Sequence, residues 1–137
     1  MKTILAMMAA SLLFLGGFNT ADAQNNKKEA QPAGIVSDEM KDGLRIVHYR
    51  PDDIVCSVDI EIHTQGDVIE YVKFTKGCNG NAKGIGALIK GMKMDEAIAK
   101  LQGITCGRRP TSCPDQLANA LIAIQKAKPA KNSAKKK

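Results

Sequence analysis

The chain has 137 residues with 20 basic and 14 acidic side chains, which gives a formal net charge of +6. This length suits one domain and excludes a multidomain catalyst. Basic and acidic side chains balance within residues 42–125, and six lysines beyond residue 125 supply the whole excess. No aromatic residues are interleaved with these lysines, as they are in proteins that bind single-stranded nucleic acid.

The first 23 residues are typical of a cleaved export signal. Lys2 gives a positive start, residues 4–18 form an apolar run, and Ala21-Asp-Ala23 matches an A-x-A cleavage site. The apolar run is short for a membrane span, which needs roughly 20 apolar residues. We therefore expect a protein exported to a bacterial periplasm or cell envelope, with no transmembrane segment after cleavage.

Composition divides the rest of the chain into three parts. Residues 24–41 are polar and contain Pro32 and Gly34, which predicts a linker. Residues 42–127 carry the apolar periodicity of a folded domain. Residues 128–137 are rich in lysine and contain no acid, which predicts a disordered tail. Such a tail makes weak contacts with nucleic acid at most.

The first half of the predicted domain reads as three strands joined by short turns. Residues 44–50, 56–63 and 68–74 each alternate apolar and polar side chains. The turns between them fall at Pro51-Asp-Asp53 and Gln65-Gly-Asp67. Strands joined in this way form an antiparallel meander.

Helical spacing follows the strands. Ile85, Leu88, Ile89 and Met92 share one stripe, and a short second helix starts near Asp95. A third helix is predicted over residues 114–126, because Pro114 suits a first helical turn. The sequence therefore predicts an α+β domain, in which about three helices pack on one face of a three-stranded antiparallel meander.

All four cysteines fall at the ends of these elements. Cys113 precedes the third helix and Cys78 lies in a turn before the first, so both meet the positive end of a helix dipole. That environment favours the thiolate, which binds metals and attacks disulfides. Cys56 begins a strand pattern and Cys106 lies seven positions before Cys113. We expect Cys56, Cys78, Cys106 and Cys113 to converge on one site.

The cysteine segments resemble the TSCPD domain family, which is named after the run Thr111-Ser-Cys-Pro-Asp115. Further matching features are Gly77-Cys-Asn-Gly-Asn81, Gly84-Ile85 and Cys106-Gly-x-Arg109. The resemblance covers roughly residues 44–124. It implies an accessory role beside ribonucleoside-diphosphate reductase, because the domain is also found at the C-terminus of adenosylcobalamin-dependent reductases. This chain is too short for a complete reductase, so that cofactor would act only through a reductase or other redox partner.

A more distant resemblance is to the NifU/IscU iron–sulfur scaffold, a two-layer domain. Cys56, Cys78 and Cys113 fall at places that correspond to the scaffold's three cysteines. Cys106 has no counterpart there and would supply a fourth ligand. This resemblance implies a zinc or iron–sulfur centre.

The residues alone leave three functions open. Four thiolates suit zinc or iron–sulfur ligation. Alternatively, Cys106 and Cys113 with Arg108 and Arg109 between them form a thiol–disulfide relay, since the positive charges favour thiolates. Third, two disulfides in any of three pairings would staple an exported binding domain. His48, His63, Thr111 and Ser112 are better explained by structural roles than by catalysis.

Overall fold

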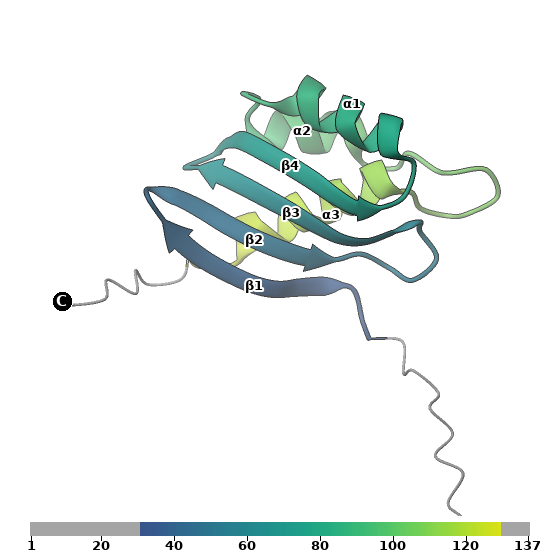
Figure 1. Cartoon of the computed structure of the whole chain (residues 1–137), viewed down its shortest axis with the longest axis horizontal. Helices are drawn as coiled ribbons and strands as arrows, with labels where there is room; N and C mark the ends of the chain where they lie inside the picture. Colours follow the sequence, from purple (N-terminus) through teal and green to yellow (C-terminus); the bar gives the residue numbers. More distant parts are fainter. Residues whose placement is uncertain (1–30, 130–137) are drawn as a thin grey trace, which may run out of the picture.

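The computed structural model describes residues 31–129 (Figure 1). The predicted export signal and the part of the predicted tail beyond residue 129 therefore lie outside the described residues. The described chain forms a four-stranded antiparallel sheet, with its strands in chain order, followed by three helices. The elements are β1 (Gly34–Lys41), β2 (Leu44–Arg50), β3 (Ser57–Gln65), β4 (Val68–Lys76), α1 (Asn79–Ile89), α2 (Met94–Leu101) and α3 (Cys113–Lys126).

The predicted α+β class is confirmed, but the prediction of three strands is wrong. The additional strand is β1, which falls within the segment predicted to be a linker. It pairs with β2 through a tight hairpin at Asp42-Gly43, where φ is +52° and +80°. Positive φ at both central residues is the geometry that an Asp-Gly pair favours in two-residue hairpins.

Arg45 on β2 ties the outer strand to the last turn of α3. Its Nε and Nη2 donate to the carboxylate of Asp38 at 2.9 and 2.6 Å. Nη1 and Nη2 also donate to the carbonyls of Ile124 and Ala127 at 2.9 and 3.1 Å. Carbonyls at the end of a helix lack partners within the helix. The Arg45 guanidinium therefore caps α3 and holds β1 in the sheet.

The hydrophobic core lies between one face of the sheet and helices α2 and α3. In Figure 1, α3 passes behind the strands and α2 lies behind α1. The centre of the core consists of fully buried aliphatic side chains, including Ile60, Ile62, Leu117, Leu121 and Ile124. Helix α1 lies beside the edge strand β4 (Figure 1). Among the helices of residues 31–129, none has the length and apolar character that a membrane span requires.

Glycine at position 86 allows α1 to approach β4 closely. A Cβ atom built at Gly86 would lie 2.8 Å from the carbonyl oxygen of Val72. Side chains do not tolerate that distance, and the neighbouring atom is backbone, which cannot rotate away. The same construction at Gly84, in the same helix, meets nothing within 4 Å. The two glycines therefore have different roles.

We predict opposite effects for alanine at these two positions. Gly84→Ala should raise the free energy of unfolding by about 0.5–1 kcal/mol, because alanine is the better helix former. Gly86→Ala should lower it by roughly 1–2 kcal/mol, since the overpacking cost exceeds the gain in helix propensity. Urea unfolding of both variants measures the difference, and equal stabilisation by both would contradict the close approach of α1 to β4.

Candidate functional site

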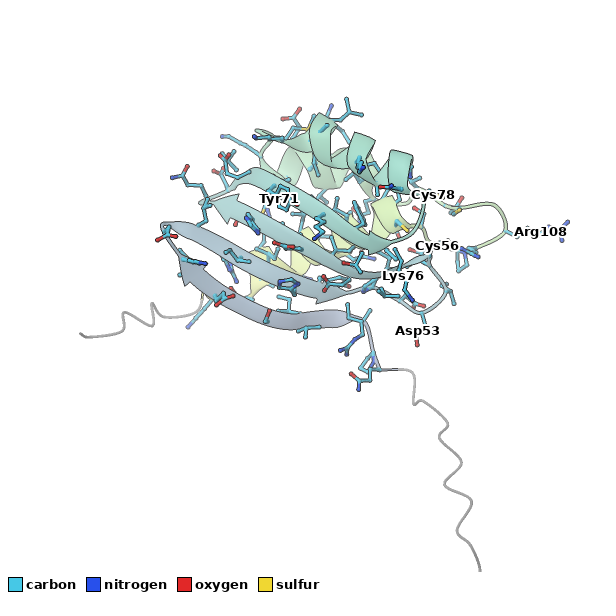
Figure 2. The ribbon with its side chains drawn as sticks, viewed as in Figure 1. Asp53, Cys56, Tyr71, Lys76, Cys78 and Arg108 are labelled. Carbon is cyan, nitrogen blue, oxygen red and sulfur yellow. The ribbon has the colours of Figure 1, made fainter. Side chains whose placement is uncertain are left out.

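Three loops meet at one end of the sheet, where β4 runs into α1 (Figure 1). They are the β2–β3 loop, the β4–α1 turn and the α2–α3 loop. Figure 2 shows Cys56 and Cys78 near each other at this end, with Arg108 on the outermost part of the α2–α3 loop. Cys106 lies on that same loop, and Cys113 is the first residue of α3. Three separate segments thus bring the four cysteines to one region.

All four cysteines line a single cavity of about 220 Å³. None of them is in a disulfide; Cys56, Cys78 and Cys106 are exposed, and Cys113 is half-buried. Within residues 31–129, no group of three His, Cys, Asp or Glu side chains has the arrangement that holds a metal ion. The thiols therefore share a cavity without being gathered around one point.

The β4–α1 turn places Cys78 beside the start of α3. Lys76 and Gly77 both adopt left-handed backbone conformations, with φ of +66° and +88°. A Cβ built at Gly77 would lie 3.9 Å from the Cys113 sulfur and 3.7 Å from the backbone nitrogen of Ser57. Gly77 thus supplies the positive φ that other residues adopt at a cost, and its backbone lies close to Cys113 and Ser57. Cys78 follows immediately and is the N-cap residue of α1.

The non-cysteine residues of the Thr111–Asp115 run hold the start of α3 in place. Ser112 is the N-cap: its Oγ accepts from the Asp115 amide at 3.3 Å and donates to the Ile104 carbonyl at 2.5 Å. The Asp115 carboxylate accepts from the Thr111 hydroxyl at 2.5 Å and from the Gly103 amide at 2.7 Å. These bonds fix both ends of the loop that carries Cys106, and they set Cys113 at the cavity.

Gln116 connects α3 to the loop that carries Cys56. Its side-chain oxygen accepts from the Asp52 amide at 3.0 Å, and its nitrogen donates to the Thr111 hydroxyl at 3.0 Å. The side chain is buried. Sequence analysis did not identify Gln116, because a single glutamine in a helix gives no sign that its partner lies 64 positions away.

Two side chains donate hydrogen bonds to cysteine sulfurs. Arg109 Nη1 lies 3.1 Å from the Cys56 sulfur, and Ser57 Oγ lies 3.3 Å from the Cys113 sulfur. The hydrogen bond to Cys56, and then the charge of that thiolate, raise the pKa of the exposed Arg109 guanidinium. Arg109 thus faces the cysteines, whereas Arg108 projects away from the domain (Figure 2). The arginine pair that the sequence presents as one unit is split between the site and the solvent.

The two histidines lie outside the lining of this cavity. His48 Nδ1 contacts Asp59 at 3.1 Å, and His63 Nε2 contacts Glu61 at 2.8 Å. These pairs lie on strands of the sheet, and the His63 ring packs at a tilt against Tyr71, with ring centroids 5.0 Å apart. Both histidines therefore have local partners.

A family model for the TSCPD domain matches residues 37–125. The match spans more than half of the chain, which therefore belongs to the TSCPD domain family. Its range begins within β1 and ends within α3, so it covers all four cysteines. No curated protein and no solved structure is significantly similar to the chain.

We predict that Ser112→Ala lowers the free energy of unfolding by about 1–2 kcal/mol, because α3 loses its N-cap. The carbonyl of Ile104 also loses its partner, which loosens the Cys106 loop. Urea unfolding measures the loss, and hydrogen exchange of residues 102–112 measures the loosening. Ser37→Ala at an exposed position of β1 is the control, and it should change stability by no more than about 0.5 kcal/mol. Equal effects of the two substitutions would show that the cap is unimportant.

Proposed function

We propose that this chain is a metal-binding accessory domain, with a zinc ion or an iron–sulfur cluster held by Cys56, Cys78, Cys106 and Cys113. The observation that carries the proposal is that four thiols from three separate chain segments line one cavity and none forms a disulfide. A structural core does not need this arrangement, because buried aliphatic side chains already fill the space between the sheet and the helices.

The donor set suits this group of metals. Soft thiolate ligands select zinc and iron–sulfur clusters over hard cations. Cys78 is the N-cap residue of α1 and Cys113 is the first residue of α3, so both lie at the start of a helix, where backbone amides lack partners within the helix. Cys56, Cys78 and Cys106 are exposed and lie in loops or turns, so the proposal requires these segments and their side chains to move until the sulfurs surround one ion. The bonds from Ser112 and Asp115 hold Cys113 as a fixed ligand toward which the others close.

A bound zinc ion would stabilise the fold, whereas a bound cluster would carry single electrons. In either case the chain's own residues temper the charge of the thiolates. Arg109 supplies a positive charge and a donor to Cys56, and Ser57 donates to Cys113. Hydrogen bonds to ligating sulfurs orient them and tune the centre.

The association with ribonucleoside-diphosphate reductase is also part of this proposal, and it is supported by membership of the family. In that role the domain would serve a reductase or another redox partner, and adenosylcobalamin would belong to that partner. The distant resemblance to the NifU/IscU scaffold in the positions of Cys56, Cys78 and Cys113 is the reason why an iron–sulfur cluster is proposed beside zinc. Export to the periplasm or envelope is proposed from the first 23 residues, and N-terminal mass spectrometry of protein from the native host tests it.

A thiol–disulfide relay is the second candidate, favoured by the 3.1 Å contact between Arg109 and the Cys56 sulfur. In a relay, two thiols lose two electrons and two protons to an oxidised partner and join as a disulfide. A positive guanidinium beside a thiol stabilises the attacking thiolate. The relay and the metal centre use the same residues but differ in what the purified protein contains.

We predict that protein purified without oxygen contains stoichiometric zinc or iron, and that Cys113→Ser reduces the metal to background. Removing one ligand leaves three thiolates that cannot complete a four-thiolate shell. Elemental analysis combined with a thiol count makes the measurement. His63→Ala is the matched control, because histidine is a side chain of a type that binds metals but His63 lies outside the cavity. This variant should retain full metal content.

Metal-free protein in which Cys106 forms a reversible disulfide with Cys113, or in which Cys56 forms one with another of the four cysteines, would overturn the metal centre and favour the relay. Two disulfides that resist mild reductant would overturn both and leave a stapled binding domain. Mass mapping of cysteine pairs before and after reduction distinguishes these outcomes.

A further inference from the structure

A second and larger cavity lies between β4 and α1. Its volume is about 500 Å³, within the range typical of sites for small molecules. Four lysines and one carboxylate are among its lining residues; they are Lys73, Lys76, Lys83, Lys90 and Glu70. The cleft therefore carries a surplus of positive charge, although basic and acidic side chains balance over residues 42–125 as a whole.

The helix side of the cleft is a regular stripe on α1 and the residue that follows it. Lys83, Gly86, Ala87 and Lys90 are spaced i, i+3, i+4 and i+7, which places them on one face. The two lysines lie about 10 Å apart along the axis. Between them the stripe has no side chain larger than a methyl group. Helix α1 thus presents a small apolar floor at the exposed Ala87, with one lysine on either side along the helix, while Gly86 packs against β4.

The strand side adds aromatic surface. Tyr71 and Phe74 line the cleft, and 44% of the Tyr71 surface is exposed (Figure 2). Lys73 stands between them in sequence and is also exposed. An aromatic ring beside this small apolar floor accommodates a planar or apolar group. Lysine ammonium groups act as flexible point charges, and phosphate and carboxylate are suitable partners for them.

We propose that the β4–α1 cleft binds a small organic anion, in which a phosphate or carboxylate group is attached to an apolar ring or chain. The anionic group would meet Lys73 and Lys83, and the apolar body would lie over Ala87 against Tyr71. The lining combines positive charge with an apolar floor in one cavity. A ligand that carried only an anionic group, or only an apolar body, would therefore use only part of it.

The cleft shares a wall with the thiol cavity. Phe74, Lys76, Gly77 and Ala82 line both. Helix α1 separates the two cavities: Asn81 and Ile85 line the thiol cavity, whereas Lys83 and Ala87 line the cleft. A bound anion would therefore lie one helix away from the thiols. The inference does not depend on a metal centre, and its test applies to metal-free and metal-loaded protein alike.

Three probes test the proposal by isothermal titration calorimetry on the full chain: 1-naphthyl phosphate, inorganic phosphate and 1-naphthol. The first should bind about tenfold more tightly than either of the others, because it alone offers both an anion and apolar area. A Lys73→Gln/Lys83→Gln variant should weaken its binding about fivefold or more. Lys93→Gln/Lys100→Gln is the control with the same charge change outside the cleft, and it should leave binding unchanged.

A second variant tests the cavity without altering charge. Ala87→Trp fills the floor from an exposed helix position, so it should abolish naphthyl phosphate binding while leaving the unfolding midpoint nearly unchanged. An equal loss of naphthyl phosphate affinity in both lysine double variants would show that only the net charge of the protein matters, and this would overturn the proposal. Failure of naphthyl phosphate to saturate, or binding that survives Ala87→Trp, would overturn it as well.

Discussion

The packing of α3 across the sheet fixes the position of the thiol cavity at the start of the helix and of the Arg45 contacts at its end. Leu117, Leu121 and Ile124 are fully buried and belong to the same core as the strand side chains Ile60 and Ile62. Burial on this scale, at about 25 cal/mol for each Å² of apolar area, outweighs any single polar contact in the molecule. Once the helix is seated, its first residue lies at the thiol cavity and its last carbonyls lie over β2. The same packing of α3 therefore supports the sheet and positions the cysteine site.

The residues of the TSCPD run divide their roles between shape and chemistry. Thr111, Ser112 and Asp115 are engaged in hydrogen bonds that close the α2–α3 loop. Ser112, Cys113 and Pro114 all line the cavity, and Cys113 is the one of these three with a reactive side chain that takes no part in closing the loop. A serine or threonine in such a run invites interpretation as a nucleophile. The capping geometry gives a complete account of both hydroxyls, and it explains why a helix has to begin at this point.

Much of the fold could be predicted from local pattern, and the failures have physical causes. The strands β2 and β3 and the helix α3 follow simple periodicity. The strand β1 was missed because most of its side chains are at least partly exposed, although Asp42-Gly43 is a strong hairpin signal. In β4, strict alternation from Val72 would bury Glu70. The register shift between His63 and Thr64 buries Ile69 instead. A bulge of this kind depends on the partner strand, which sequence periodicity does not contain.

The candidate site, like the fold, could be predicted only in part. The four cysteines could be chosen from their position at element ends, since helix starts are visible in the sequence. The partners of these cysteines could not, because Arg109 meets Cys56 across 53 positions and Ser57 meets Cys113 across 56. The lysine cleft was also missed. Lys83 and Lys90 have helical spacing, but Lys73 joins them only when β4 lies beside α1.

The Arg45–Asp38 ion pair has a consequence for how the sheet is assembled. Both side chains are largely buried, with 11% and 17% exposure, and they lie on the core side of neighbouring strands. Because side chains alternate between faces, a slip of β1 by one position would turn Asp38 toward water and leave the buried guanidinium without its counter-ion. The apolar content of β1 is too low to specify its alignment. The two-residue hairpin at Asp42-Gly43 sets the register, and the salt bridge adds an electrostatic penalty against any other pairing of the strand.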